Sequence, residues 1–495
     1  MSSMTRRQFL AYSAAAGALA VLPTLPLSRG TVLAAPDKAA TIRAGMRTIE
    51  VNGRSAQVFG LQQPDGSHGL VTEAGRRFRA RLENDTDEKT LIHWHGLTPP
   101  FEQDGVPELS QPLLPPGEAY DYDFPLERSG THWMHSHEGL QEQRLMAAPL
   151  IVRDPEEAGD DVQEVVVMLH DFTFRDPEEI LADLARHGHG NGHGNGHGNG
   201  HGNGHGNGHG NGHGNGHGNG HGNGHAGVHL HDVDYDAFLA NDRTLADPEV
   251  FRVERGGRVR LRLINAATAT NFRIDLNGME GRLIAVDGMP IEPVVGHQFE
   301  MAIAQRLDIL MDLPSEEGAW PVFAVREGER ARTGFVLATP NGEVRRLAEY
   351  AEHAVEAVGL DLETRLQAAN PLERREPDRR HTLRFSEASG YTWEINGAVF
   401  GEHQPLNANP GERVEITFID DTTMAHPMHL HGHHFQVVAV NGQRFSGAMR
   451  DTVLVPARGR VTIAFDAINP GRWALHCHHL YHMAGGMMTT LEYGA

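Results

Sequence analysis

Short runs of residues that alternate between apolar and polar side chains recur along most of this chain. In Phe78–Leu82 and again in Val259–Leu263 every second residue is apolar, which is the repeat of a β-strand with one buried face. Turn-forming residues bound these runs, and many short strands joined by turns are typical of β-sandwiches. Similar runs are Thr48–Val58, Val165–Leu169, Ile303–Met311, Val414–Ile419, His434–Val440 and Val461–Phe465. We expect an all-β protein with helices only at Glu178–Arg186 and Val344–Ala357.

The length indicates several domains, because 495 residues exceed what one hydrophobic core usually organises. Roughly 450 residues remain after an N-terminal signal is set aside, and these suit three units of ordinary size. We expect breaks near 153–161 and 342–360. The predicted domains are therefore residues 40–155, 160–342 and 360–495.

The N-terminus has the pattern of an export signal. Arg6 and Arg7 precede an apolar, alanine-rich stretch at Ala11–Leu27, and the small residues Ala34 and Ala35 could end it. This resembles a twin-arginine signal peptide, predicted at residues 1–35, and implies a periplasmic protein. A basic, disordered N-terminus is the alternative.

A low-complexity tract interrupts the second predicted domain. From His189 the tetrapeptide His-Gly-Asn-Gly repeats nine times and ends at Gly224. Nothing in it is apolar, and Gly and Asn disfavour helix and strand, so we expect residues 187–231 to be a disordered insertion. Its imidazoles could bind extra metal ions weakly. A linker without a selected role is the alternative.

Charge and composition exclude several classes of protein. The chain has 43 basic and 65 acidic residues, a formal net charge of −22, which argues against binding to nucleic acid or to an anionic membrane surface. Beyond the N-terminus no apolar run reaches the roughly 18 residues of a membrane span. The single cysteine excludes an intrachain disulfide, and 33 histidines point toward metal binding.

Four separate His-x-His pairs lie outside the tract, and a fifth, His431-Gly432-His433, overlaps the third of them. Residues i and i+2 of a strand project to the same face, so each pair can present two imidazoles to one metal cluster. Eight imidazoles suit two or three copper ions, for which imidazole is a favoured ligand. If these histidines were instead ordinary buried core residues, the same spacing would have to arise by chance four times. The pairs are His93 and His95, His135 and His137, His429 and His431, and His476 and His478.

The lone cysteine, Cys477, lies inside the last pair. Alternation along a strand would direct its thiolate away from the two flanking imidazoles. A thiolate with two imidazoles and a weak axial Met forms a blue-copper site, and His426, His482 and Met487 could complete it. Electrons accepted at Cys477 could then leave through its own backbone to the flanking histidines.

These motifs resemble the multicopper oxidases, specifically the three-domain kind related to bacterial copper-resistance oxidases. Two further segments support the resemblance: Asp104-Gly105-Val106-Pro107 and His135-Ser136-His137-Glu138-Gly139-Leu140-Gln141-Glu142-Gln143. The resemblance implies three cupredoxin-like Greek-key β-sandwich domains and four copper ions per chain. It implies a type 1 copper held by His426, Cys477, His482 and axial Met487, a type 2 copper held by His93 and His429, and a type 3 pair held by His95, His135, His137, His431, His476 and His478.

The resemblance implies that four one-electron oxidations of a donor are coupled to reduction of O2 to water. Asp104 matches an acid that the family places beside the cluster, where it would relay protons; a turn-forming Asp before Gly105 is the alternative. Cu(I) oxidation in copper tolerance is the leading donor hypothesis, although the chain lacks a Met-rich insertion and has Met483 where some members have an acid. The alternatives are a laccase-like phenol oxidase, a copper-sequestering protein built around the tract, and a copper nitrite reductase.

Overall fold

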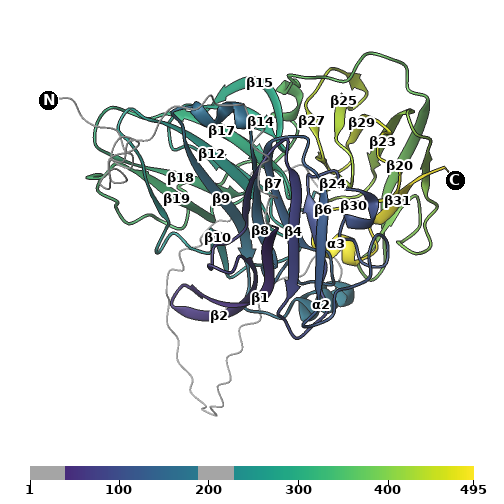
Figure 1. Cartoon of the computed structure of the whole chain (residues 1–495), viewed down its shortest axis with the longest axis horizontal. Helices are drawn as coiled ribbons and strands as arrows, with labels where there is room; N and C mark the ends of the chain where they lie inside the picture. The colour runs from purple at the N-terminus through teal and green to yellow at the C-terminus, as the bar shows by residue number, and fades with distance from the viewer. Residues whose placement is uncertain (1–38, 188–227, 495) are drawn as a thin grey trace, which may run out of the picture. The chain divides into compact units, whose positions relative to one another are not determined.

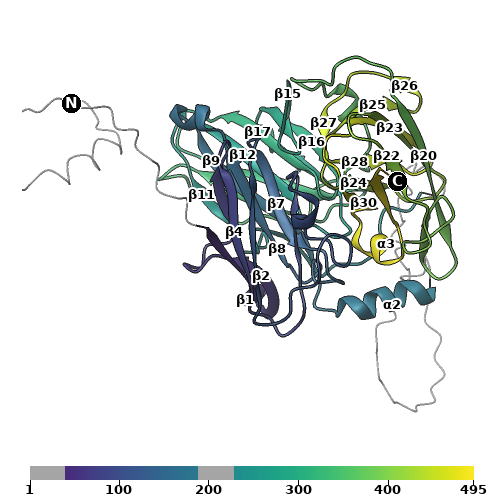
Figure 2. The same cartoon turned by 45° about the vertical axis from the view of Figure 1, so that its right-hand side comes forward.

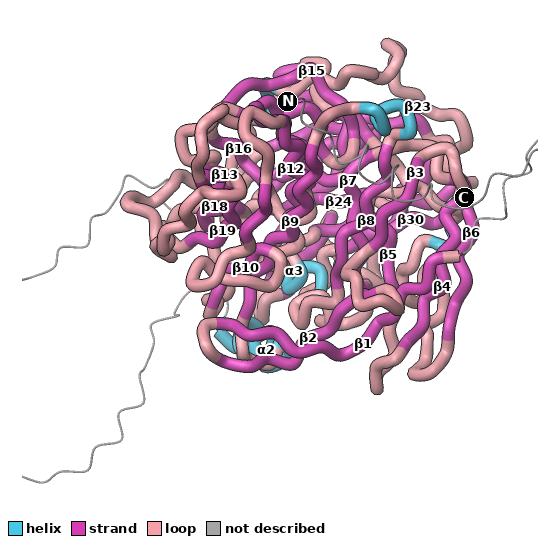
Figure 3. The backbone as a smooth tube through the Cα atoms, turned by 60° about the vertical axis from the view of Figure 1, so that its left-hand side comes forward, coloured by secondary structure: helices cyan, strands magenta, loops and turns pink. Residues whose placement is uncertain are grey.

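The computed structural model describes residues 39–187 and 228–494, and β-strands dominate this part of the chain (Figure 1). Strands account for nearly all of its regular structure, as the tube view also shows (Figure 3). The all-β prediction is therefore confirmed. The predicted signal peptide and almost all of the predicted insertion lie outside the described residues. No helix in the described part of the chain is long and apolar enough to cross a membrane.

Residues 40–153 form two four-stranded sheets. Their strands are β1 (Ala40–Val51), β2 (Arg54–Gln62), β3 (Leu70–Glu73), β4 (Arg77–Asn84), β5 (Ile92–His95), β6 (Ala119–Pro125), β7 (Gly130–Ser136) and β8 (Ala147–Arg153). One sheet has the order β2-β1-β4-β6 and the other β3-β8-β7-β5. Strand β1 is antiparallel to β2 and parallel to β4, so the chain crosses between the sheets instead of forming only hairpins.

Residues 163–338 form two larger sheets. Their strands are β9 (Gln163–Phe172), β10 (Ala237–Ala240), β11 (Val250–Arg252), β12 (Arg258–Asn265), β13 (Phe272–Asp275), β14 (Gly281–Val286), β15 (Met289–Gly296), β16 (Gln298–Met301), β17 (Arg306–Asp312), β18 (Ala319–Arg326) and β19 (Arg332–Ala338). The sheet orders are β10-β9-β12-β17-β14-β15 and β11-β19-β18-β13-β16.

Residues 379–493 form the last two sheets. Their strands are β20 (Arg379–Ala388), β21 (Thr392–Ile395), β22 (Leu406–Ala408), β23 (Arg413–Asp420), β24 (His426–Leu430), β25 (Phe435–Val440), β26 (Gln443–Arg444), β27 (Met449–Arg450), β28 (Thr452–Val455), β29 (Arg460–Asp466), β30 (Arg472–Cys477) and β31 (Met488–Tyr493). One sheet has the order β21-β20-β23-β29-β25-β26, with β27 on β25, and the other β22-β31-β30-β24-β28.

Each pair of sheets buries the apolar positions that alternate along its strands. In β4, Phe78, Ala80 and Leu82 are buried and the arginines between them are not. A separate large core lies within each third of the chain: around Phe78 and Trp94, around Leu261 and Phe272, and around Phe418 and Trp473. The sandwich arrangement follows from this alternation, because one face of each sheet must be covered.

Two α-helices are described, α2 (Pro177–His187) and α3 (Leu480–Ala484). The helix predicted at Glu178–Arg186 is confirmed as α2. The Asp176 carboxylate accepts a hydrogen bond from the backbone N–H of Glu178 and so caps its N-terminus. Ile180 and Leu184 of α2 pack into the core of the C-terminal strands, beside α3 (Figure 2).

The helix predicted at Val344–Ala357 is wrong. This segment is irregular, with one isolated β-bridge from Tyr350 to Ala331, and the backbone N–H groups of Ala351 and Val355 donate to the carbonyls of Arg330 and Glu329. Leu347, Ala351 and Val355 pack beside a small cluster. Their spacing of four residues matches a helix face, but four is also a multiple of the strand repeat, so the pattern cannot distinguish the two structures.

Thr48–Val58, predicted as one strand, is a hairpin formed by β1 and β2. Asn52 and Gly53 both have positive φ, of 50° and 80°, as a tight two-residue turn between antiparallel strands requires. The Asn-Gly dipeptide is a turn signal that the alternation on either side of it obscured.

Candidate metal centre

The eight paired histidines come together from both ends of the chain. In the N-terminal third, β5 and β7 are antiparallel neighbours with His93 opposite His135. In the C-terminal third, β24 and β30 are antiparallel neighbours with His429 opposite His476. All eight rings are buried except that of His137, which is partly exposed. The second histidine of three pairs lies just beyond its strand, where it still faces the same cluster.

The ring nitrogens form three groups, each with its members within 4.8 Å of one another. One group is His95, His135 and His478, another is His137, His431 and His476, and the third combines His93 and His429 with His95. The Nε2 atoms of His431 and His476 are 3.0 Å apart, and those of His93 and His429 are 3.5 Å apart.

These positions fit metal ions. Two nitrogens each about 2.0 Å from one ion, at a roughly tetrahedral angle, are about 3.3 Å apart. His95 Nδ1, His135 Nε2 and His478 Nε2 are buried without a hydrogen-bond partner among the described residues. A buried unpaired nitrogen is costly, and a bound cation would satisfy all three.

Burial favours the neutral form of most imidazoles in the cluster. Burial, reinforced by neighbouring rings, lowers the pKa of His95, His429 and His431 well below 6.5. Burial also lowers the pKa of His476 to about 3. Neutral imidazoles retain the lone pair that binds a metal.

Asp104 lies against the cluster. Its Oδ2 accepts a hydrogen bond from His431 Nδ1 at 2.9 Å, and its backbone carbonyl accepts one from His93 Nδ1 at 2.8 Å. Gly105 allows this approach: its φ is +87°, and a β-carbon there would lie 1.9 Å from the Ile92 carbonyl oxygen. Asp104 therefore both ends a tight loop and contacts one histidine from each end of the chain.

Two further acids contact the cluster, and neither was identified from the sequence. Glu142 Oε2 is 3.0 Å from His135 Nδ1, and burial raises the pKa of Glu142 well above 4.5. Asp451 Oδ1 is 3.1 Å from His95 Nε2, and its backbone carbonyl accepts a hydrogen bond from His429 Nδ1. In the sequence, the signal for Asp451 is that it belongs to a charged dipeptide, Arg450-Asp451, directly before the apolar run of β28.

A second group contains the cysteine. Cys477 Sγ is 3.7 Å from Nδ1 of His426 and 3.7 Å from Nδ1 of His482, and these two nitrogens are 3.1 Å apart. Met487 is fully buried, and its backbone bonds to both Cys477 and His482. Burial raises the pKa of the Cys477 thiol, so a nearby cation would be needed to hold the thiolate. The donor set of one sulfur and two imidazoles suits copper.

The two groups are joined through the backbone of β30 and the residue that follows it. Cys477 faces His426 and His482, whereas its neighbours His476 and His478 belong to two different groups of the eight-histidine cluster. The shortest connection between the sulfur and the cluster is therefore covalent.

The outer nitrogen of His482 is covered. Asp232 Oδ2 is 2.9 Å from His482 Nε2, the Tyr391 hydroxyl donates to the same carboxylate, and the Asp232 side chain is 0% exposed. The His479 ring stacks on that of His482 at 3.7 Å. Asp232 was missed in the sequence because it directly follows histidines that were assigned to the tract.

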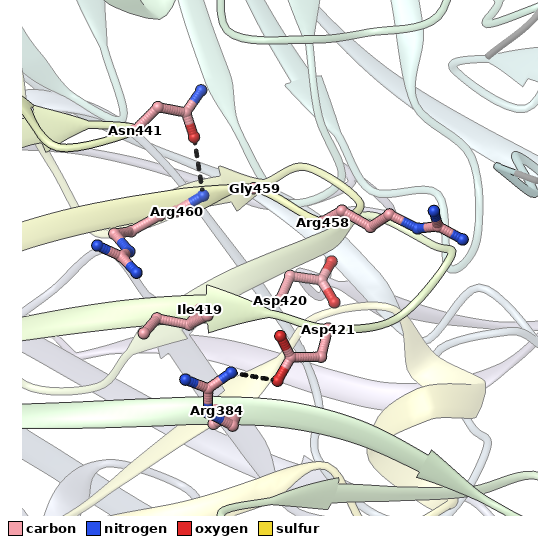
Figure 4. A pocket seen from close by; sticks show the side chains of 8 residues that line it. All are labelled: Arg384, Ile419, Asp420, Asp421, Asn441, Arg458, Gly459 and Arg460. Carbon is pink, nitrogen blue, oxygen red and sulfur yellow. Dashed lines mark hydrogen bonds and ion pairs between the residues drawn. The ribbon is translucent and has the colours of Figure 1, made fainter.

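A surface hollow of about 610 Å³ lies on the side of His426. Asp420, Asp421, Arg384, Arg458 and Arg460 line much of it, and Figure 4 shows the Arg384 guanidinium directed at Asp421. Asp420 is buried, and burial raises its pKa to about 7. Asp420 Oδ1 is 3.8 Å from His426 Nε2, so this carboxyl separates the hollow from the sulfur-containing group.

The remaining histidines near the motifs are not in the three groups. His132, His433, His434 and His479 are buried or nearly so, and His433 bonds to Tyr493. His170 lies on β9 and bonds to the Ala266 carbonyl.

Three family profiles described as multicopper oxidase match the chain at residues 46–157, 163–341 and 373–494. A profile for the twin-arginine translocation signal matches residues 3–23.

The similar proteins include a multicopper oxidase, a copper resistance protein and a laccase. The chain is 29% identical to the multicopper oxidase MmcO of Mycobacterium tuberculosis, over 99% of this chain and 96% of that protein. It is 24% identical to copper resistance protein A of Escherichia coli, over 90% of each. Among solved structures, the laccase from Botrytis aclada matches with a TM-score of 0.73 and 21% identity, over 91% of this chain and 86% of that chain.

Proposed function

Because the chain belongs to the multicopper oxidase family, we propose that it couples one-electron oxidations of a donor at a sulfur-containing copper site to the reduction of O2 at the histidine cluster. The observation that carries this proposal is the grouping of ring nitrogens and thiol into sets of the size and spacing of metal sites. The signal profile indicates export, and we propose the periplasm as the destination.

The proposed ligands are assigned by group. His426, Cys477 and His482, with Met487 as a further ligand, would hold a type 1 copper. His93 and His429 would hold a type 2 copper. The other two groups would hold the type 3 pair: His95, His135 and His478 for one ion, and His137, His431 and His476 for the other. We also propose residues 40–155, 160–342 and 360–495 as separate domains, since each contains its own sheets and core.

Copper bound by these residues would supply one-electron redox chemistry, through which four electrons and four protons convert O2 to two waters. The chain's own contribution begins with the covalent connection from Cys477 to His476 and His478. Buried backbone carbonyls and carboxylates orient the rings by accepting from Nδ1, as Asp104 does for His431. We propose that the Asp104 carboxyl also relays protons to the cluster, because it is buried, accepts from His431 Nδ1 and lies 3.3 Å from His93 Nδ1.

The surroundings of the sulfur-containing group favour Cu(I) as donor, with copper tolerance as the role. A carboxylate lies over the outer nitrogen of His482, and the ring of a phenol could not reach that nitrogen without displacing Asp232 and Tyr391. A cation is attracted to the same carboxylate, and the net charge of −22 adds to the attraction. The resemblance to laccases makes a phenol the second candidate.

O2 uptake by the copper-loaded protein tests the donor. Cu(I) and a phenol such as dimethoxyphenol are compared side by side, with Cys477→Ser as the inactive control. We expect faster uptake with Cu(I). Faster uptake with the phenol would assign the protein as a laccase, and no uptake with either donor, from a blue and fully loaded protein, would refute the oxidase assignment.

The variant Asp232→Ala tests the identity of the donor by removing the carboxylate that covers His482. Removing the carboxylate should open His482 to organic donors, so the ratio of Cu(I) to phenol kcat/KM should fall about 10-fold or more. Asp234→Ala is the matched control, because Asp234 is an exposed acid on the same segment. An unchanged ratio in Asp232→Ala would show that donors do not approach His482 from this side.

Deletion of residues 189–224 separates the oxidase from a copper-sequestering protein. The oxidase proposal predicts that turnover with saturating donor is retained, because all twelve proposed ligands lie outside the tract. Loss of copper protection in cells with normal turnover in vitro would instead support sequestration by the tract.

A further inference from the structure

His95 is oriented differently from most of the cluster. Five of the other rings, those of His93, His135, His429, His431 and His476, bond through Nδ1 to a protein oxygen and so direct Nε2 at their group. His95 bonds through Nε2, to Asp451 Oδ1 at 3.1 Å and to the Thr452 hydroxyl at 3.2 Å. Its Nδ1 is buried and has no partner among the described residues. His95 can therefore bind a metal only as the tautomer protonated on Nε2.

The partner of His95 is held by an arginine from the middle third of the chain. Arg306, on β17, donates from Nη1 to Asp451 Oδ1 at 2.7 Å and from Nη2 to Asp451 Oδ2. Its Nε donates to the Thr131 carbonyl at 3.1 Å. Both carboxylate oxygens thus accept from the guanidinium, so Asp451 has no proton to offer His95, and Nε2 of His95 must donate.

The residue after His95 is a glycine, which leaves room for the Arg306–Asp451 ion pair. Gly96 has a φ of +90°, and a β-carbon there would lie 2.6 Å from Arg306 Nη2 and 3.1 Å from Asp451 Oδ2. A β-carbon there would also lie 2.5 Å from His132 Nδ1, so a side chain at this position would crowd both His132 and the Arg306–Asp451 pair. Arg306 is 0% exposed, and a fully buried ion pair adds little stability compared with apolar residues of the same volume. Stability alone is therefore a poor explanation of the pair.

We propose that Arg306 is a positioning residue, which sets the tautomer and orientation of His95 through Asp451 and so prepares one position of the cluster for copper. The inference rests on the copper assignment proposed above. It also gives the middle third of the chain, which supplies no proposed ligand, a direct effect on the metal site.

Two variants test the proposal in the copper-loaded protein. In Asp451→Asn one of the two accepting oxygens becomes an NH2 group, which faces an N–H of Arg306 in either orientation of the amide, so the paired contact with Arg306 that holds the acceptor of His95 in place is lost. In Arg306→Lys the charge remains, but one ammonium cannot bond both oxygens in the plane of the carboxylate. Arg262→Lys is the control, because Arg262 is equally buried and pairs with Asp308 and Glu164 without touching a histidine of the cluster.

Three quantities are measured: copper per chain after dialysis against a chelator that strips weakly held ions, the blue type 1 absorption, and the melting temperature. We expect both variants to bind cluster copper 10–100-fold more weakly. They should keep the blue absorption and melt no lower than the control.

Wild-type copper retention in both variants would overturn the inference. So would a loss of blue absorption in parallel with a melting temperature below that of the control, since Arg306 would then be a general packing residue. If the wild-type protein itself binds no copper at the cluster, the proposed function is refuted. That outcome differs from one in which the wild-type protein and both variants bind copper equally well, which refutes only the role of Arg306.

Discussion

Cys477→Ser is expected to abolish both the blue absorption and oxidase turnover, while copper at the eight-histidine cluster is retained. The thiol is the one sulfur between Nδ1 of His426 and Nδ1 of His482, and a serine hydroxyl is a far weaker copper ligand than a thiolate. The covalent connection to His476 and His478 remains, but without the type 1 copper no group delivers electrons to it. Turnover with any donor should fall to the rate without enzyme, as measured by O2 uptake, absorption spectroscopy and copper analysis.

Ala474→Ser is the matched control, because it adds the same hydroxyl to a buried position three residues earlier on β30. It should keep the blue absorption and most of the turnover. If Cys477→Ser were to remain an oxidase with either donor, electrons would have to enter at another place, and the assignment of the sulfur-containing group as the entry site would be wrong.

Asp104→Asn is expected to lower kcat at saturating donor by about 10²–10⁴-fold, the usual contribution of a positioned proton-transfer group. Asparagine keeps the size of the side chain and can still accept from His431 Nδ1, but it cannot carry a proton. Copper content and the blue absorption should therefore stay close to those of the wild-type protein, which separates a proton relay from a ligand-orienting role.

Glu102→Gln serves as the control for Asp104→Asn, since Glu102 is an exposed acid two residues away and its removal should leave kcat unchanged. A normal kcat in Asp104→Asn would mean that protons reach the cluster elsewhere, with Glu142 beside His135 as the next acid to test. A loss of copper in Asp104→Asn would make its role structural.

The sequence predicted features that depend on local repeats and failed where distant segments meet. Alternation identified the strands, and the i, i+2 rule identified the eight imidazoles, because both are properties of neighbouring residues. The helix repeat was misleading at Val344–Ala357, where apolar residues four apart occur without a helix. Alternation missed the turn at Asn52-Gly53, which lies inside a run of alternating residues.

The residues around the proposed ligands could not be predicted in this way. Asp232 lies 250 residues from His482, and Arg306 lies 145 residues from Asp451. No spacing rule connects such pairs, since their contact depends on how the sheets of different thirds of the chain pack together. The sequence signal that comes nearest to indicating such contacts is a charged residue at the edge of an apolar strand, as Arg306 is at the start of β17 and Asp451 is directly before β28.

Anomalous diffraction at the copper edge from crystals of the copper-loaded chain tests the central claim most directly. The account predicts one copper between His426, Cys477 and His482 and three within the eight-histidine cluster, with His95 bound through Nδ1. A cluster holding fewer than three coppers in an active enzyme, or an empty sulfur-containing group, would contradict it.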